Sequence, residues 1–117
     1  MTKTVIHIFH DDDDSLMIGS RVPQRIDEVA AEHDSEVEVF VFGPAQRRLS
    51  RAETEADTHF NRQIDELIAA GVRVGACLNA AKSDGVDGEL IDRGLVLSVA
   101  RDEFLRFTVE RATVISF

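Results

Sequence analysis

The chain holds a single cysteine, Cys77, which follows a short strand-like run. Formation of a nucleophilic thiolate is favoured where a strand ends and a helix begins, because unpaired backbone N–H groups point toward that place. A lone cysteine excludes an internal disulfide, a Cys-x-x-Cys redox pair and a multi-thiolate metal site within one chain. Cysteine is also among the most buried residue types, so position alone supports a structural cysteine equally well.

His10 and the acidic run 11–14 follow the first strand-like segment. If the ends of that strand and of the strand before Cys77 lie together, His10 could accept the thiol proton or hold a substrate. The simpler interpretation is an exposed loop histidine. The four aspartates could bind a hard cation such as Mg²⁺, but capping of the following helix explains them better. Since no two histidines have the spacing of a helical metal site, we expect no bound metal.

Gly43 and Asn79 are two further candidates at the ends of predicted elements. Gly43, followed by a proline, could shape the rim of a cleft, although ordinary turn chemistry is the simpler interpretation. Asn79 and the backbone N–H groups after Cys77 could stabilise an anionic sulfur. The chain has neither a GxGxxG motif nor a Walker loop, so the usual phosphate-binding loops are missing.

Strand-like and helix-like stretches alternate along the chain. The strand-like segments are 4–9, 36–42, 72–76, 95–99 and 113–117, and the main helical segments are 15–33, 44–49, 56–70 and 102–110. This alternation predicts an α/β domain with a largely parallel sheet that is covered on both faces. Ligand-binding and catalytic groups collect at the carboxyl ends of the strands in such folds.

Two of the predicted helices carry specific expectations. In the first, apolar residues with helical spacing are Ile18, Val22, Ile26 and Val29, and Pro23 should kink the helix or begin a second piece. In 102–110, the residues expected to face inward are Phe104, Leu105 and Thr108.

The overall composition limits the partners that we expect. With 117 residues the chain forms one domain, 1–117, and its net charge of −9 repels nucleic-acid backbones. The basic cluster around Arg47, Arg48 and Arg51 is best interpreted as a solvated helix face. No apolar run approaches the roughly 20 residues that span a bilayer, and the first residues lack the apolar core of a signal peptide. We therefore expect a cytoplasmic protein that binds neither nucleic acid nor membrane.

The segment 71–86, GVRVGACLNAAKSDGV, resembles the signature of the DsrE/DsrF-like family, which includes the TusD-type sulfur-relay subunits. That signature is a Gly-Val, an apolar strand, a cysteine and a short helix that ends in Gly-Val or Gly-Ile. The resemblance extends over nearly the whole chain, since Gly43 follows the second strand and the chain ends on an apolar strand. Relay members often carry arginines just before the second Gly-Val, where this chain has Lys82, Ser83 and Asp84. Local positive charge is therefore lower here.

The resemblance implies a three-layer α/β/α sandwich around a mainly parallel five-stranded sheet, and a homo-oligomer such as a trimer or hexamer. It also implies that Cys77 accepts a sulfane sulfur from a donor protein as a persulfide and passes it to an acceptor protein. No cofactor is expected, because thiol–persulfide exchange is the same substitution chemistry as disulfide exchange. Two alternatives stay open: a non-enzymatic oligomeric module that binds a small ligand, and a redox sensor in which Cys77 is oxidised reversibly.

Overall fold

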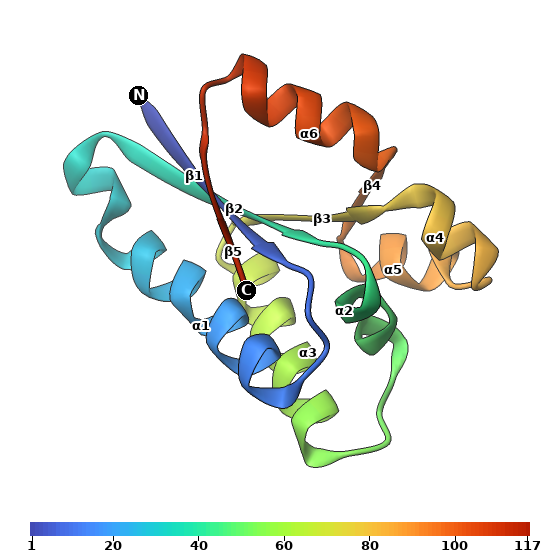
Figure 1. Ribbon diagram of the computed structural model, residues 1–117. Coiled ribbons are helices and arrows are strands. Elements are labelled where there is room, and N and C mark those ends of the chain that lie inside the picture. The colour runs from blue at the N-terminus through green and yellow to red at the C-terminus, as the bar shows by residue number, and fades with distance from the viewer.

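A five-stranded sheet forms the centre of the molecule in the computed structural model, which describes residues 1–117 (Figure 1). The strands are β1 Thr2–Ile8, β2 Ser35–Val41, β3 Arg73–Cys77, β4 Val96–Ser98 and β5 Thr113–Ser116. They lie in the order β4-β3-β2-β1-β5, and every pairing is parallel. The predicted parallel sheet is thus confirmed, and the long crossovers that parallel neighbours require are supplied by the helices.

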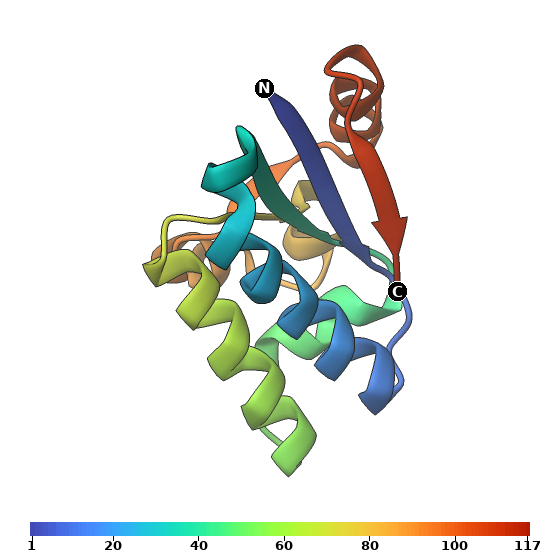
Figure 2. The ribbon, with the colours of Figure 1, turned by 90° about the vertical axis from the view of Figure 1, so that its left-hand side faces the viewer.

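Helices cover both faces of this sheet. They are α1 Asp13–Ala30, α2 Pro44–Arg47, α3 Glu55–Ala69, α4 Leu78–Ser83, α5 Asp87–Arg93 and α6 Ala100–Val109, with 3-10 turns at Ala31–His33 and Arg48–Ser50. Figure 2 shows α1 and α3 on one side of the sheet and α6 on the other, so the domain is a three-layer sandwich. None of the helices combines the length and the hydropathy that crossing a bilayer would require.

The two faces of the sheet bury different side chains. The face under α1 and α3 is aliphatic, and the strand residues packed there include Ile6, Ile8, Val39, Val41, Val74 and Ala76. The face under α6 is aromatic: Phe40 and Phe107 are buried with Val5, and Phe42 and Phe104 pack against them. We call this second surface the α6 face. Because successive strand residues point to opposite faces, strand position decides which of the two surfaces a side chain joins.

Helix α1 agrees with some expectations and departs from others. It continues through Pro23 as one helix rather than beginning a second piece there, and Asp12 caps it as expected, by accepting a hydrogen bond from the Ser15 N–H at 3.0 Å. The buried residues are mostly small, namely Leu16, Gly19, Ser20, Pro23 and Ala30, whereas Ile18 and Val29 are exposed. The reason is close packing, since a Cβ on Gly19 would lie 3.1 Å from Cγ1 of Ile8. A helix that lies so near the sheet buries its small residues and leaves larger ones at the margin.

The inward face of α6 is also different from the predicted one. Phe104 packs on the α6 face as expected, with its ring at right angles to those of Phe40 and Phe42. Leu105, however, is 62% exposed, and Thr108 is exposed too. Their predicted place is taken by Phe107 and by Glu103, whose carboxylate accepts a hydrogen bond from Nη2 of Arg73 at 2.8 Å. The buried Glu103 carboxylate is thus neutralised by Arg73 of β3 and by Arg106 of α6 itself.

Candidate functional site

Cys77 is the last residue of β3, and α4 begins at the next residue. Its neighbour Ala76 belongs to the aliphatic cluster, so strand alternation directs the Cys77 side chain to the opposite, α6 face, the side on which a Cβ of Gly75 would also lie. The surroundings of Gly75 support this orientation, because a Cβ there would lie 3.2 Å from Cδ1 of Phe40, which is on the α6 face. Cys77 is only 7% exposed and belongs to the buried core of the domain. The thiol is thus buried at the end of an interior strand.

The side chain of Gln46 binds the main chain of Cys77 on both sides of its Cα atom. The Cys77 N–H donates to Oε1 of Gln46 at 2.9 Å, and Nε2 of Gln46 donates to the Cys77 carbonyl oxygen at 2.8 Å. Gln46 lies on α2 and is 5% exposed. Sequence reasoning missed this residue, because a glutamine in a four-residue helix has no periodicity or motif that would indicate it.

Ser98 flanks Cys77 on the opposite side. The two residues are paired in register between β3 and β4. In-register neighbours of a parallel sheet point to the same face, so the half-buried Ser98 side chain lies beside that of Cys77 on the α6 face. Sequence reasoning missed Ser98 as well. Its place at the end of the fourth strand was the available signal, but the strand order needed to use that signal could not be derived from periodicity.

A pocket of about 310 Å³ opens between α2 and α4 at this end of the sheet. Its lining comes from both helices and from the end of β2: Phe42, Gly43, Pro44, Gln46, Arg47, Ala80, Ser83 and Asp84. Nε of Arg47 lies 3.8 Å from Oδ2 of Asp84, and this ion pair joins α2 to α4. Both side chains are exposed, so the pair contributes little to stability. Gln46 connects the pocket to Cys77, because it lines the one and binds the other.

Gly43 lines this pocket, whereas His10 does not. Gly43 lines it with a φ of 64°, and a Cβ there would overlap the ring of Phe9. The ring of His10 packs against the same Phe9 ring, with centroids 5.3 Å apart. His10 follows β1, however, and β2 lies between β1 and β3. The structure therefore connects His10 to Gly43 through Phe9, and does not bring it beside Cys77.

Asn79 lies two residues after Cys77 on α4 and is exposed. The residues by which α4 lines the pocket are Ala80, Ser83 and, at its end, Asp84. The Asn79 side chain makes no hydrogen bond within the chain. It is near Cys77 in sequence but stands outside the pocket.

His7 is an additional titratable group on the α6 face. Its ring lies among four aromatic rings, those of Phe9, Phe40, Phe42 and Phe104. Nδ1 is 3.0 Å from Oγ of Ser116, whereas Nε2 is buried without a hydrogen-bond partner. Burial, together with the nearby charge of His10, lowers the pKa of His7. His7 is therefore a half-buried imidazole that packs among phenylalanines.

The acidic run 11–14 has structural partners. Asp12 caps α1, and the hydrogen bonds from Ser15 lower the pKa of its carboxyl group. Arg48 donates to the carbonyl oxygen of Asp11 at 2.7 Å and to Oδ1 of Asp13 at 3.1 Å. Nowhere in the chain are three or more histidine, cysteine or acidic side chains grouped so that they could hold a metal ion.

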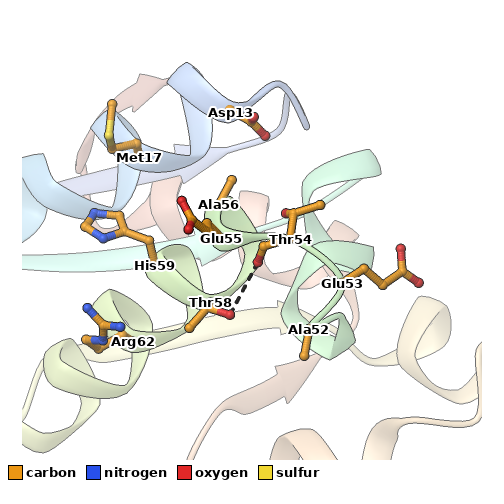
Figure 3. A pocket seen from close by; sticks show the side chains of 10 residues that line it. All are labelled: Asp13, Met17, Ala52, Glu53, Thr54, Glu55, Ala56, Thr58, His59 and Arg62. Carbon is orange, nitrogen blue, oxygen red and sulfur yellow. Dashed lines mark hydrogen bonds between the residues drawn. The ribbon is translucent and has the colours of Figure 1, made fainter.

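A larger depression on the surface, about 700 Å³, is separate from the pocket between α2 and α4. It lies where α1 and α3 begin, and Figure 3 shows Asp13 and Met17 of α1 on one side of it, opposite Glu55, His59 and Arg62 of α3. The hydrogen bond drawn there runs from the Thr58 hydroxyl to the Thr54 carbonyl oxygen, 3.3 Å away, within α3 and its cap. We place the candidate site at Cys77, because volume alone supplies no reacting group.

The fold of this chain is found in several solved structures. A conserved protein of unknown function from Bacteroides thetaiotaomicron, BT1422, superposes with a TM-score of 0.77 over 98% of this chain and 94% of its own, at 14% identity. Protein MTH1491 of unknown function from Methanobacterium thermoautotrophicum gives 0.73 at 23% identity, and the ychN protein from E. coli gives 0.72 at 19% identity. Both alignments cover 100% of each chain. At these identities the likeness shows a shared fold.

Sequence comparison leads to the family. No curated protein matches the chain. The model of the DsrE/DsrF-like family, by contrast, matches residues 5–117, which runs from within β1 through β5 and includes the segment around Cys77. The chain therefore belongs to the DsrE/DsrF-like family.

Proposed function

We propose that this protein is a sulfur carrier in which Cys77 accepts a sulfane sulfur as a persulfide and passes it to a partner protein. The observation that carries the proposal is the placement of the only thiol in a DsrE/DsrF-like chain. Cys77 ends a central parallel strand beside a pocket, where ligand-binding groups of such sheets collect.

The proposed chemistry consists of two substitutions at sulfur. The Cys77 thiolate attacks the terminal sulfur of a donor persulfide, R–S–SH. The donor S–S bond breaks as the new one forms, the donor leaves as the thiolate R–S⁻ with the bonding electron pair, and Cys77 becomes Cys77–S–SH. An acceptor thiolate then attacks the terminal sulfur and releases the Cys77 thiolate. Neither step consumes an oxidant or a reductant, as in thiol–disulfide exchange.

The surroundings of Cys77 suggest how the carrier works. The Ser98 hydroxyl, which is paired in register with Cys77, can donate a hydrogen bond to a thiolate or persulfide anion. Arg47 lines the pocket from α2, but its charge is paired with that of Asp84, so the pocket has no net positive charge in place of the arginines that the motif before Gly85 lacks. Because Cys77 is 7% exposed, exchange with a partner requires movement of the segment that covers it.

Measurement of intact mass tests the proposal. The protein is incubated with a small persulfide donor, and its mass is recorded before and after treatment with a reductant. We expect a reducible gain of one sulfur atom in the wild-type protein and none in Cys77→Ser. The variant Ser50→Ala removes an exposed hydroxyl that bonds only to the Arg47 carbonyl oxygen, and it should take up sulfur like the wild type.

The same measurement separates the alternatives. If the wild-type protein gains no sulfur under conditions that load a known acceptor, the carrier function is wrong. A thiol that also resists alkylation in the folded protein would then be structural. A thiol that instead forms a reversible sulfenic acid with peroxide would favour a redox sensor.

We further propose that the chain forms a homo-oligomer, a trimer or a hexamer. Strand β5 is one edge of the sheet, and its Val114 and Ile115 are both exposed. Helix α1, which packs against Phe117 at Gly19, also exposes Ile18. Exposed apolar side chains on an edge strand and its neighbouring helix are typical of surfaces that associate. Light scattering after gel filtration should give three or six times the chain mass, and a monomer at micromolar concentration would contradict this expectation.

A further inference from the structure

Gln46 binds Cys77 in the way that a neighbouring strand would. In an antiparallel ladder, two opposed residues exchange both of their backbone hydrogen bonds. The Gln46 carboxamide makes the same exchange with the N–H and the carbonyl oxygen of Cys77, at 2.9 and 2.8 Å. A side chain supplies the bonds here because β2 ends at Val41, before it reaches the level of Cys77, and the chain then turns at Gly43 into α2.

The two hydrogen bonds with Gln46 leave the main chain of Cys77 little conformational freedom. The two hydrogen bonds fix the peptide groups before and after its Cα atom, and on the other edge β4 pairs with it at Ser98. Both partners of the Gln46 carboxamide are buried, so no water can replace it without rearrangement. The direction of the Cα–Cβ bond, and hence the place of the sulfur on the α6 face, therefore depends on Gln46.

We propose that Gln46 is a positioning residue for Cys77, which holds the thiol in the orientation that sulfur transfer needs. The catalytic meaning of this inference rests on the proposed carrier function, whereas the geometric part concerns the thiol alone. Gln46 touches only the main chain of Cys77, so it acts through that residue and not on the sulfur that is transferred. Misplacing a reacting atom by about 1 Å can slow a reaction by up to a hundredfold.

A matched pair of buried glutamines provides the first test. Gln46→Met removes both hydrogen bonds at similar side-chain volume. Gln63→Met removes a carboxamide on α3 that is also 5% exposed but bonds only to His59. For each protein, the rate of sulfur loading is divided by the rate of Cys77 alkylation by iodoacetamide. We expect this ratio to fall about tenfold or more in Gln46→Met. In Gln63→Met it should stay near the wild-type value.

A second variant gives a signature that general damage to the fold would not produce. In Gln46→Glu, the ionised carboxylate can accept from the Cys77 N–H but cannot donate to its carbonyl oxygen. When protonated, the introduced carboxyl regains a donor and restores the pair. Relative to the wild type measured at each pH, sulfur loading by Gln46→Glu should therefore recover as the pH is lowered from about 8 to about 6, since burial raises the pKa of a carboxyl group.

The outcomes distinguish this inference from the function on which it rests. If the ratio falls equally in Gln46→Met and Gln63→Met, or if Gln46→Glu follows the wild-type pH profile, the positioning role is wrong. If the wild-type protein takes up no sulfur, the carrier function is wrong. The rate of Cys77 alkylation alone then tests whether Gln46 positions the thiol. In that case an altered alkylation rate in Gln46→Met but not in Gln63→Met supports the inference, and equal rates in all three proteins overturn it.

Discussion

Asp57 accepts a hydrogen bond from Nε of Arg48 at a place where Asp57 is only 2% exposed. The same carboxylate accepts from the backbone N–H groups of Glu53 and Thr54, at 3.1 and 3.2 Å. The other guanidinium nitrogens of Arg48 reach the loop before α1 and its first turn. Arg48 directly follows α2, so this ion pair ties the segment that carries Gln46 to both α1 and α3.

Loss of the Asp57 carboxylate should strongly destabilise the fold. Asp57→Ala leaves the guanidinium of Arg48 without its buried partner, and we expect the free energy of unfolding to fall by about 3 kcal/mol. Asp65→Ala is the control, because Asp65 is 57% exposed in its pair with Arg93 and should cost about 1 kcal/mol or less. Urea unfolding at neutral pH measures the loss of unfolding free energy in both variants. Equal losses would show that the Arg48–Asp57 pair stabilises the fold no more than an exposed pair does.

The same pair predicts a loss of stability in acid. Burial alone would raise the pKa of Asp57, but the hydrogen bonds from Arg48 and from two backbone N–H groups hold it below its usual value. The folded state then binds fewer protons than the unfolded state. Its stabilising contribution is complete above the unfolded pKa of about 3.9 and is lost as the pH falls through the lower folded pKa. Unfolding curves below about pH 4 should therefore differ less between wild type and Asp57→Asn than curves at pH 7.

His7 should make the protein less stable already in mild acid. Burial and the charge of His10 lower the pKa of His7 in the folded protein, whereas the unfolded chain takes up the proton near pH 6.5. Between the two pKa values the unfolded state binds more protons, so the free energy of unfolding falls as the pH drops below about 6.5. Urea unfolding at about pH 7.5 and 5.5 should show this loss in the wild type and a smaller loss in His7→Phe. The same loss in both proteins would assign the effect to other groups.

A methyl group at Gly43 should disturb both stability and sulfur loading. Gly43 has a φ of 64° and a ψ of −144°, which strains any other residue, and the added Cβ would overlap the ring of Phe9. Gly71→Ala is the control that measures the cost of the positive φ without a steric overlap. Its φ is 86°, but no atom lies within 4 Å of the added Cβ. We expect Gly71→Ala to cost about 1–2 kcal/mol and Gly43→Ala clearly more. Only Gly43→Ala should slow sulfur loading, since it displaces α2. Similar unfolding midpoints for Gly43→Ala and Gly71→Ala would contradict this interpretation.

The strands and the family could be predicted from the sequence, because their signals are local. Strands β1, β2 and β5 are short runs rich in β-branched or aromatic residues, and the residues around Cys77 form a contiguous motif. The inward faces of α1 and α6 were harder to predict from the sequence. Gly19 and Ser20 are buried because α1 lies close to the sheet, and Glu103 is buried where Arg73 of β3 joins Arg106 in neutralising it. Both causes involve residues that are distant in sequence.

The surroundings of Cys77 were the least predictable part of the site. Its pairing with Ser98 depends on the strand order, which hydrophobic periodicity does not encode. Its pairing with Gln46 depends on where β2 stops and how the chain turns at Gly43. His10 seemed a natural neighbour of the thiol because both residues follow strands. The position of β2 between β1 and β3 separates them.

The bonds between Gln46 and Cys77 also make the backbone amide of Cys77 a built-in reporter. Its proton is shielded by a side chain from α2, whereas the interior amides of β3 are protected by the sheet itself. Local opening of α2 would therefore let deuterium replace this one proton while the sheet stays protected. The exchange rate at a single peptide bond would thus record how often the thiol becomes available to another protein.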